Sequence, residues 1–437
     1  MKKNTALIIG IFAFSVIAFS ASLNTVQAKQ SALPDTVKIG FLYPATGGLG
    51  PIGGGLLDGA KAAIHRLNEE NTDVTFELVS QDTATTPDTG KTVAQTLVSD
   101  GVKVIVGAAG SGITLAASEV TIPNHVPLIS YSSTSPAISD LGDDDYVFRV
   151  VASDLYQGQA LAQLATDKGV TKAYILNLDN AYGNGVADQF EAKFKELGGT
   201  VAGQTAYDEK ASSFASEVTA AKDSGADGVI IVAYPEDANK IFAEAKTQAV
   251  AVKWFGTDGI ASSSVTNNEG TADYVKDKLF GTQPSSGTAS TGSKYDQYVA
   301  DVASVSGSEG IFGDYAYDAV LLAGSAVVDA GEYDGVKIRD SLYKVADGFA
   351  ASTGANKAFN CDGEPISQAY DYWKVNATDS SVEVETARAK DFTGLGAKAT
   401  TPCGENKYVP ASSPGFELYL LFSALVVVSA TAIRKRK

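Results

Sequence analysis

Two clusters of small hydroxyl residues have the spacing of a binding site for a compact polar ligand. The apolar run Val102–Val106 leads into the glycine-rich segment GAAGSG, which contains Ser111, and the apolar run Pro127–Ser130 leads into a second cluster. This second cluster consists of Ser132, Ser133 and Thr134. If both runs are neighbouring parallel strands, the hydroxyl groups and the free N–H groups of the following helices share one edge of the sheet. Such an edge can bind a carboxylate.

Four charged or aromatic residues also follow apolar runs. They are Asp154, Tyr182, Tyr234 and Asp258. Ligands of open α/β sheets bind outside the carboxyl ends of the strands, so two facing sheets would bring all of these residues to one cleft. Simpler roles stay open for each of them. Ser111, Thr134 and Asp154 also suit helix capping. The tyrosines also suit an interface, and Asp258 suits a turn.

This combination of groups is suited to an α-amino acid. Hydroxyl and N–H groups would take the carboxylate, Asp154 and Asp258 would take the ammonium, and the tyrosines would close over the ligand. Neither His65 nor His125 follows a predicted strand, and no nucleophile elbow occurs at a strand–helix turn. The glycine-rich loop 46–55 lacks the Lys-Ser/Thr pair of a phosphate loop, so we expect its glycines to let the backbone approach a ligand or another lobe. We expect no enzyme, no cofactor and no metal site.

The apolar runs alternate with amphipathic segments in two successive series. The first series has predicted strands at Val37–Tyr43, Thr75–Ser80, Val102–Val106, Pro127–Ser130 and Tyr146–Val151. The second has them at Ala173–Leu178, Thr200–Ala206, Gly228–Ala233 and Lys253–Gly256. Apolar strands separated by helices indicate parallel sheets that are buried on both faces. The predicted fold class is therefore α/β, with two Rossmann-like doubly wound lobes, a multi-crossing hinge and a ligand cleft between the lobes.

The region after residue 280 contains too little strand for a third domain. It holds predicted helices at Gly313–Ala330 and Lys337–Ala346 and a strand at Ala369–Val375, and residues 377–413 are expected to be irregular. These segments are expected to pack back on both lobes. The predicted organisation is a signal peptide at 1–28, lobe 1 at 36–153 plus 281–355, lobe 2 at 154–280 plus 356–395, a linker at 396–413 and a C-terminal sorting or transmembrane segment at 414–437.

Both ends of the chain have the pattern of targeting segments. Lys2 and Lys3 precede a short apolar run that ends near the small-residue site Val26-Gln27-Ala28, which predicts a cleaved signal peptide rather than a retained anchor. The apolar run Leu418–Ile433 and its basic tail predict a membrane tether with the folded part outside the cell.

The net charge of −17 argues against nucleic acid as a partner.

Only two cysteines occur, Cys361 and Cys403. In an extracytoplasmic compartment an even count predicts one disulfide, which would tie the last segment to the core. Two free thiols are the alternative.

Six segments occur in the order that is typical of one family. VKIGFLYPATGGLGPIGGGLLDGAKAAI, VIVGAAGSGITLAAS, PLISYSSTSPAI, YVFRVVASDLYQGQALA, AYGNGVADQF and GVIIVAYPEDANKIFAEAK resemble the solute-binding proteins of ABC transporters, of the branched-chain amino-acid (Leu/Ile/Val-binding) type. This resemblance covers about residues 36–375. It implies a periplasmic binding protein type I fold, with a ligand between two lobes that close and present it to a membrane permease.

The resemblance also implies roles for individual residues. Ser111 would bind the ligand carboxylate together with Ser132, Ser133 and Thr134. Asp154 would hold the ammonium, and the second lobe would contribute Tyr182, Tyr234 and Asp258. The position of Asp258 often holds Glu in the family, so the shorter side chain changes the depth of the pocket. Gly110 and Ile52 lie where family members shape the side-chain pocket, and both favour an aliphatic ligand.

The C-terminus resembles a second known pattern. Pro414-Gly415-Phe416, followed by an apolar helix and a basic cluster, is similar to the PGF sorting signal of archaeal surface proteins, which implies removal of the tail and attachment of a lipid. A plain transmembrane anchor is the alternative.

Taken together, these features predict a monomeric, cell-surface solute-binding protein that passes an amino acid to ABC permease subunits. The alternatives are an amide- or urea-binding protein of the same family, and a ligand-sensing surface protein without a permease.

Overall fold

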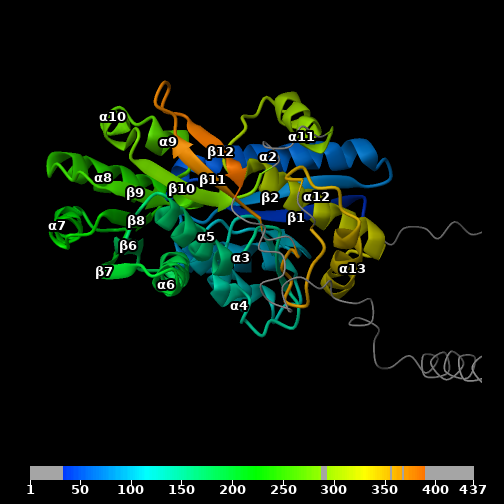
Figure 1. Ribbon diagram of the computed structural model, residues 1–437. Coiled ribbons are helices and arrows are strands. Elements are labelled where there is room, and N and C mark those ends of the chain that lie inside the picture. The colour runs from blue at the N-terminus through cyan, green and yellow to red at the C-terminus, as the bar shows by residue number, and fades with distance from the viewer. Residues whose placement is uncertain (1–32, 287–292, 355–356, 367–368, 389–437) are drawn as a thin grey trace, which may run out of the picture.

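The computed structural model describes residues 33–286, 293–354, 357–366 and 369–388, which form two α/β lobes (Figure 1). The sheet of lobe 1 is parallel and has the order β2-β1-β3-β4-β5. Its strands are β1 (Thr36–Tyr43), β2 (Thr75–Asp82), β3 (Ile105–Val106), β4 (Leu128–Ser130) and β5 (Val147–Arg149). The helices of this lobe are α2 (Gly50–Glu70), α3 (Pro87–Ser99), α4 (Ser111–Thr121), α11 (Ser293–Ser304), α12 (Gly313–Ala330) and α13 (Gly335–Asp347).

Lobe 2 contains the second sheet, in the order β12-β11-β10-β9-β8-β6-β7. Its strands are β6 (Lys172–Leu178), β7 (Thr200–Tyr207), β8 (Gly228–Val232), β9 (Lys253–Gly256), β10 (Leu279–Pro284), β11 (Tyr370–Val375) and β12 (Val382–Arg388). Only β11 and β12 run antiparallel to their neighbours. The helices are α5 (Asp154–Asp167), α6 (Ala181–Glu196), α7 (Ala215–Asp223), α8 (Pro235–Thr247), α9 (Ser263–Thr266) and α10 (Ala272–Val275). The predicted class of two doubly wound lobes is confirmed.

The glycine-rich segment expected to form a loop is largely helical. Helix α2 begins at Gly50, within this segment. A Cβ atom at Gly53 would lie 2.0 Å from the carbonyl oxygen of Pro44, and one at Gly59 would lie 2.2 Å from that of Gly313. These glycines therefore let α2 approach its own preceding loop and α12, because any side chain would clash with backbone. The expectation that the glycines of 46–55 let the backbone approach a ligand or another lobe therefore does not hold for Gly53, which faces the loop of its own lobe.

Residues expected to be irregular after position 377 form a strand instead. β12 pairs antiparallel with β11 at the edge of the lobe 2 sheet. Its sequence VEVETAR alternates apolar and polar residues, and Val382 packs against the core while Glu383 contacts Lys374 of β11 at 3.5 Å. An edge strand pairs with only one neighbouring strand and can expose one face to solvent, so a segment with alternating polar residues can form part of the sheet.

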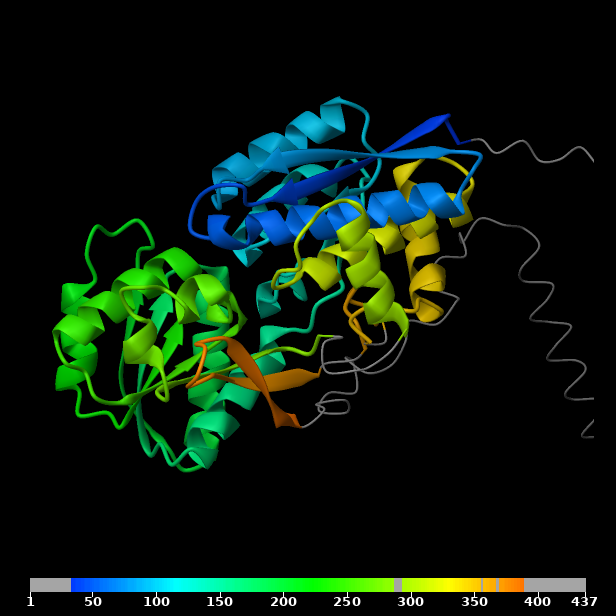
Figure 2. The ribbon, with the colours of Figure 1, turned by 90° about the horizontal axis from the view of Figure 1, so that it is seen from above.

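The chain crosses between the lobes three times: after β5, after β10 and before β11 (Figure 2). Hydrogen bonds join the crossing segments to one another. Lys357 Nζ donates to the carbonyl oxygen of Val150 at 2.7 Å, and Tyr370 donates to that of Ser153 at 2.6 Å. The N–H of Ser285, after β10, donates to the carbonyl oxygen of Ala369, before β11, at 3.0 Å. The crossings therefore form one bonded unit rather than three separate tethers.

Segments at both ends of the chain lie outside the described residues. They include the predicted signal peptide, the C-terminal helix with its sorting signal, and Cys403, so the disulfide between Cys361 and Cys403 stays a prediction. None of the helices within the described ranges is both long enough and apolar enough to cross a membrane.

A buried ion pair fixes the first crossing. Arg149 at the end of β5 is 1% exposed and pairs with Glu364, which is also buried. The same guanidinium donates to the carbonyl oxygens of Ser133 and Ser135 at 3.3 Å and 2.9 Å. Arg149 thus connects the third crossing to the loop after β4.

We expect Glu364→Ala to lower the free energy of unfolding by about 3 kcal/mol, because it leaves a buried guanidinium without its carboxylate. Urea denaturation measures this change. Glu191→Ala removes a carboxylate from the exposed pair with Lys195 and serves as the control, with an expected change of less than about 1 kcal/mol. Equal effects of the two variants would refute a special role for Arg149.

Candidate functional site

A cavity lies between the lobes at the carboxyl ends of the central strands. Five of the eight predicted ligand residues line it: Ser111, Ser132, Tyr182, Tyr234 and Asp258. Its volume of about 20 Å³ is room for about one water molecule. The lobes in this structure are therefore closed, and an amino acid requires them to separate before it can enter.

Lobe 1 contributes the N-terminus of α4 to the cavity. Ser111 is the first residue of this helix, and the cap position belongs to Gly110, whose φ of +93° suits glycine. Helical bonding begins with Ile113 and Thr114, whose N–H groups donate to Gly110, so the earlier N–H groups of the helix have no acceptor within it. The Ser111 hydroxyl accepts from the N–H of Ser135 at 3.1 Å, which leaves its own proton available to an acceptor. Ser111 thus lies at the start of the helix, beside N–H groups without helical acceptors, and does not hold the cap position.

The other hydroxyl residues of lobe 1 separate into two groups. Ser132 lines the cavity. Ser133 instead donates to the carbonyl oxygen of Ala108 at 2.9 Å and lies 2.8 Å from the hydroxyl of Thr114, so it holds the two loops together. The buried hydroxyl of Thr134 makes no geometric hydrogen bond within the described part of the chain.

Asp154 is a fully buried carboxylate at the start of α5. Ser153 caps this helix by accepting from the N–H of Leu155, so the capping role does not belong to Asp154. Its backbone N–H donates to the carbonyl oxygen of Thr134 at 2.8 Å, while neither carboxylate oxygen meets a hydrogen-bond partner among the residues the structure describes. Burial and then repulsion from Asp258 raise the pKa of Asp154 well above its ordinary value.

Lobe 2 contributes an aromatic and acidic wall. The rings of Tyr182 and Tyr234 stack with centroids 5.8 Å apart and an interplanar angle of 5°. The Tyr182 hydroxyl lies 2.6 Å from that of Thr257, donates to Asp258 at 3.2 Å and accepts from the N–H of Gly259 at 3.2 Å. Burial raises the pKa of Asp258 to about 6. Tyr182 therefore fixes the acidic group beside the cavity.

The remaining lining residues are apolar or lack a side chain. Ile52 and Gly110 line the cavity, and a Cβ atom at Gly110 would lie 3.4 Å from the Tyr234 hydroxyl. Leu49 and Phe312 also line it, although the sequence analysis did not identify them. Phe312 precedes α12 in a connection between two helices, so a search confined to the ends of strands could not find it. The apolar side of the cavity suits an aliphatic group.

Comparisons with known proteins agree with this geometry. Residues 36–378 match a family model described as periplasmic binding protein. A leucine-, isoleucine-, valine-, threonine- and alanine-binding protein of Pseudomonas aeruginosa is 27% identical over 369 residues, which are 83% of this chain and 94% of that protein.

Solved structures show the same architecture. A leucine-binding protein of Thermotoga maritima has a TM-score of 0.72 and 25% identity, over 81% of this chain and 98% of its own. The fold is also shared by a solute-binding protein of R. palustris in complex with 4-hydroxybenzoate, with a TM-score of 0.71 and 17% identity over 83% of this chain and 100% of its own. These relatives are solute-binding proteins and not enzymes, as expected here. The chain belongs to the periplasmic binding protein family, with the type I fold of the ABC-transporter solute-binding proteins of the branched-chain amino-acid type.

Proposed function

We propose that the protein captures a small α-amino acid with an aliphatic side chain between its lobes and delivers it to an ABC permease. The observation that carries the proposal is the fully buried carboxylate of Asp154, which lies behind the cavity lining and makes no hydrogen bond of good geometry in the described structure. Asp258 repels this carboxylate, while Thr134 and Arg149 offset only part of the rise in its pKa. Buried charge of one sign costs free energy until a group of the opposite sign compensates it. An ammonium group has this chemistry.

The lobe 1 side of the cavity has groups that suit the carboxylate and the side chain of an amino acid. The N–H groups at the start of α4 and the hydroxyl groups of Ser111 and Ser132 suit the carboxylate. Leu49, Ile52 and Phe312 suit an aliphatic side chain. In this proposal Ser133 and Thr134 act behind the cavity, where Ser133 fixes the loop that carries Ser132.

An aromatic acid is a weaker candidate because it carries no cation. A benzoate-type ligand would place its negative charge near two acidic side chains and compensate neither. An amide or urea offers neutral N–H donors to Asp154 and Asp258, so it is the more serious competitor and belongs in the test. A surface sensor without a permease would bind the same ligand, and loss of uptake on gene deletion separates it from a transporter component.

Asp154→Asn should weaken binding of leucine, isoleucine or valine at least 30-fold, which corresponds to about 2 kcal/mol, because the variant lacks the charge that compensates the ammonium. Calorimetry on the full-length chain at pH 7.5 measures this effect. The ligand-free variant should melt at a temperature at least as high as that of the wild type, since it no longer buries that charge.

Asp167→Asn provides the matched control, since this exposed residue ends the same helix α5, and its affinity should stay within about twofold of the wild type. The proposal fails if Asp154→Asn binds the amino acid as the wild type does. It also fails if the wild type binds only urea, amides or 4-hydroxybenzoate.

Amino-acid affinity should increase as the pH rises from 5 to 7. The pKa of Asp258 is raised to about 6, so the carboxyl group is largely protonated below that pH and must lose its proton to compensate an ammonium. Each proton released adds up to about a tenfold change in affinity per pH unit. Calorimetry between pH 5 and 8 tests this slope, and Asp258→Asn should flatten it near pH 6. A pH-independent affinity in the wild type would contradict this role.

We further propose that a C-terminal membrane tether keeps the binding lobes at the outer cell surface. The apolar run Leu418–Ile433 and Pro414-Gly415-Phe416 before it support this proposal. Mass spectrometry of the membrane-extracted protein from its native cells should find a lipid-bearing C-terminus without Arg434–Lys437. An intact Arg434–Lys437 peptide in the mature protein would favour a plain transmembrane anchor, and recovery in the soluble fraction alone would refute the tether.

A further inference from the structure

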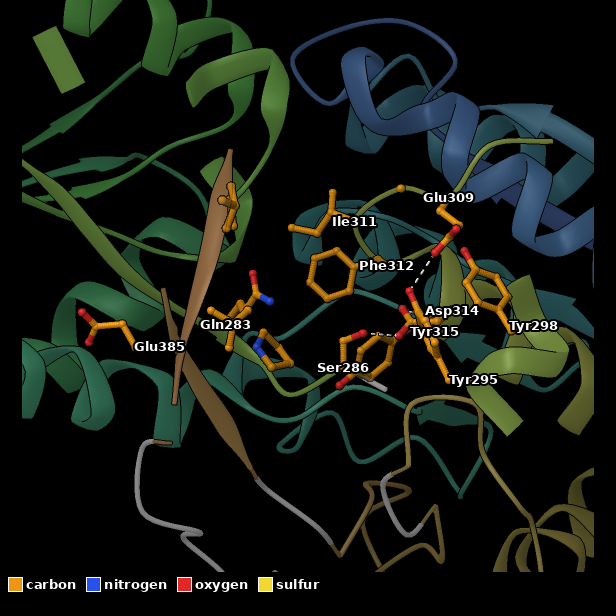
Figure 3. Close-up of a pocket in the computed structure, with 15 residues that line it drawn as sticks. Gln283, Ser286, Tyr295, Tyr298, Glu309, Ile311, Phe312, Asp314, Tyr315 and Glu385 are labelled. Carbon is orange, nitrogen blue, oxygen red and sulfur yellow. Dashed lines mark hydrogen bonds between the residues drawn. The ribbon is translucent and has the colours of Figure 1, made fainter. Parts of the chain in front are cut away.

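A second and larger cavity of about 710 Å³ lies beside the interlobe cavity (Figure 3). Lobe 1 contributes residues of α11, of α12 and of the connection between them, and lobe 2 contributes residues of β10 and β12. Phe312 lines both cavities and therefore separates them. Apart from Phe312, the residues that line this space are not part of the lining of the amino-acid site described above.

Aromatic rings form much of the lobe 1 wall of this second cavity. Tyr295 and Tyr298 lie with ring centroids 5.6 Å apart, and Phe312 and Tyr315 also lie 5.6 Å apart at an angle of 67°. All four line the cavity. The negative faces of such rings attract organic cations, most strongly where water is excluded.

Two carboxylates add negative charge to the same wall. Glu309 accepts from the Tyr295 hydroxyl at 2.8 Å, and Asp314 accepts from the Ser286 hydroxyl at 2.5 Å (Figure 3). Each carboxylate has about four lone-pair sites, so these contacts leave capacity for a ligand. The third acid at the cavity, Glu385, is already paired with Lys168 at 3.0 Å. The lining contains no Lys or Arg among the described residues.

A buried hydroxyl group at the cavity lacks a partner. Tyr298 is 1% exposed, and its hydroxyl makes no hydrogen bond within the described part of the chain. Burial, followed by repulsion from Asp314, raises the pKa of this phenol, so the hydroxyl stays protonated. A buried polar group in this state is stabilised by a ligand that hydrogen-bonds to it.

We propose that this cavity is a second ligand site, which binds an organic ammonium ion between the rings of Tyr295, Tyr298 and Phe312 and beside Glu309. The cation lies against the aromatic faces, and Glu309 compensates its charge. A hydroxyl or other polar group on the ligand reaches Tyr298. The site goes beyond the amino-acid function proposed above and does not depend on it.

The test uses choline as the probe and 3,3-dimethyl-1-butanol as its uncharged isostere. Calorimetry with the full-length chain should show that choline binds at least tenfold more tightly than the alcohol. Glu309→Gln, at an exposed position, should weaken choline binding at least tenfold and leave amino-acid affinity within about twofold. Glu332→Gln makes the same change of charge in the exposed turn after α12 and should leave choline binding unchanged.

Several outcomes would overturn the proposal. Equal binding of choline and the alcohol would show that the cavity selects only apolar volume, and no choline binding at millimolar concentration would show that it is no ammonium site. Loss of choline binding in Asp154→Asn but not in Glu309→Gln would place the probe in the interlobe cavity. None of these results bears on whether leucine, isoleucine or valine binds, so failure of this site and failure of the amino-acid site are separable.

Discussion

The closed structure buries two carboxylates close to each other, and the Arg149 guanidinium offsets only part of the resulting rise in the pKa of Asp154. Asp154 and Asp258 both belong to elements of lobe 2, and each raises the free energy of the other's charged form. Burial is the largest cause of both pKa shifts, so a closure that removes water from these groups costs free energy, which an ammonium between them would offset. A ligand whose interaction differs between the open and closed states is what shifts such an equilibrium.

The two ends of an amino acid would be divided between the lobes. The α4 N-terminus and its serines belong to lobe 1, whereas both acidic groups and the stacked tyrosines belong to lobe 2. A molecule that could bind only the lobe 1 groups or only the lobe 2 groups would contribute little free energy to closure. Under the proposed function, discrimination would arise from bridging, since a zwitterion of the right length would compensate both walls in one closed state.

The periodicity of the sequence was sufficient to predict the two sheets, because apolar strands and amphipathic helices alternate clearly up to Phe280. The rule that ligands bind at the carboxyl ends of parallel strands also selected Ser111 and Asp258. The same rule could not separate Ser132, which lines the cavity, from Ser133, which bonds to Ala108, because neighbouring residues differ only in the direction of their side chains. The rule did not select Phe312, because this residue lies in the connection between two helices, α11 and α12, and not after a strand.

Two glycine positions show a further limit of reading residue types alone. The glycines at 46–55 were expected to let the backbone approach a ligand or another lobe, but Gly53 lets α2 approach the loop before it, as the nearby Gly59 lets α2 approach α12. The two roles require the same residue, and only the neighbour's position distinguishes them. β12 was missed for a different reason. Its residues alternate between apolar and polar types as in an edge strand, but its low apolar content made the segment look irregular.

The hinge explains how the lobes can move while their relative orientation stays defined. Asp318 of α12 accepts hydrogen bonds from the backbone and side chains of Ser352 and Thr353, which pins the start of the third crossing to lobe 1. Lys357 lies 4.3 Å from the ring centroid of Tyr315 and bonds to the first crossing. Burial lowers the pKa of Lys357 to about 8, while Asp318 and Asp314 oppose that shift and keep its charge compensated. These bonds hold the crossings together, so we expect the lobes to rotate about the short segments beyond them. Asp154, Asp258 and the tyrosines all belong to lobe 2 and would then move together relative to α4.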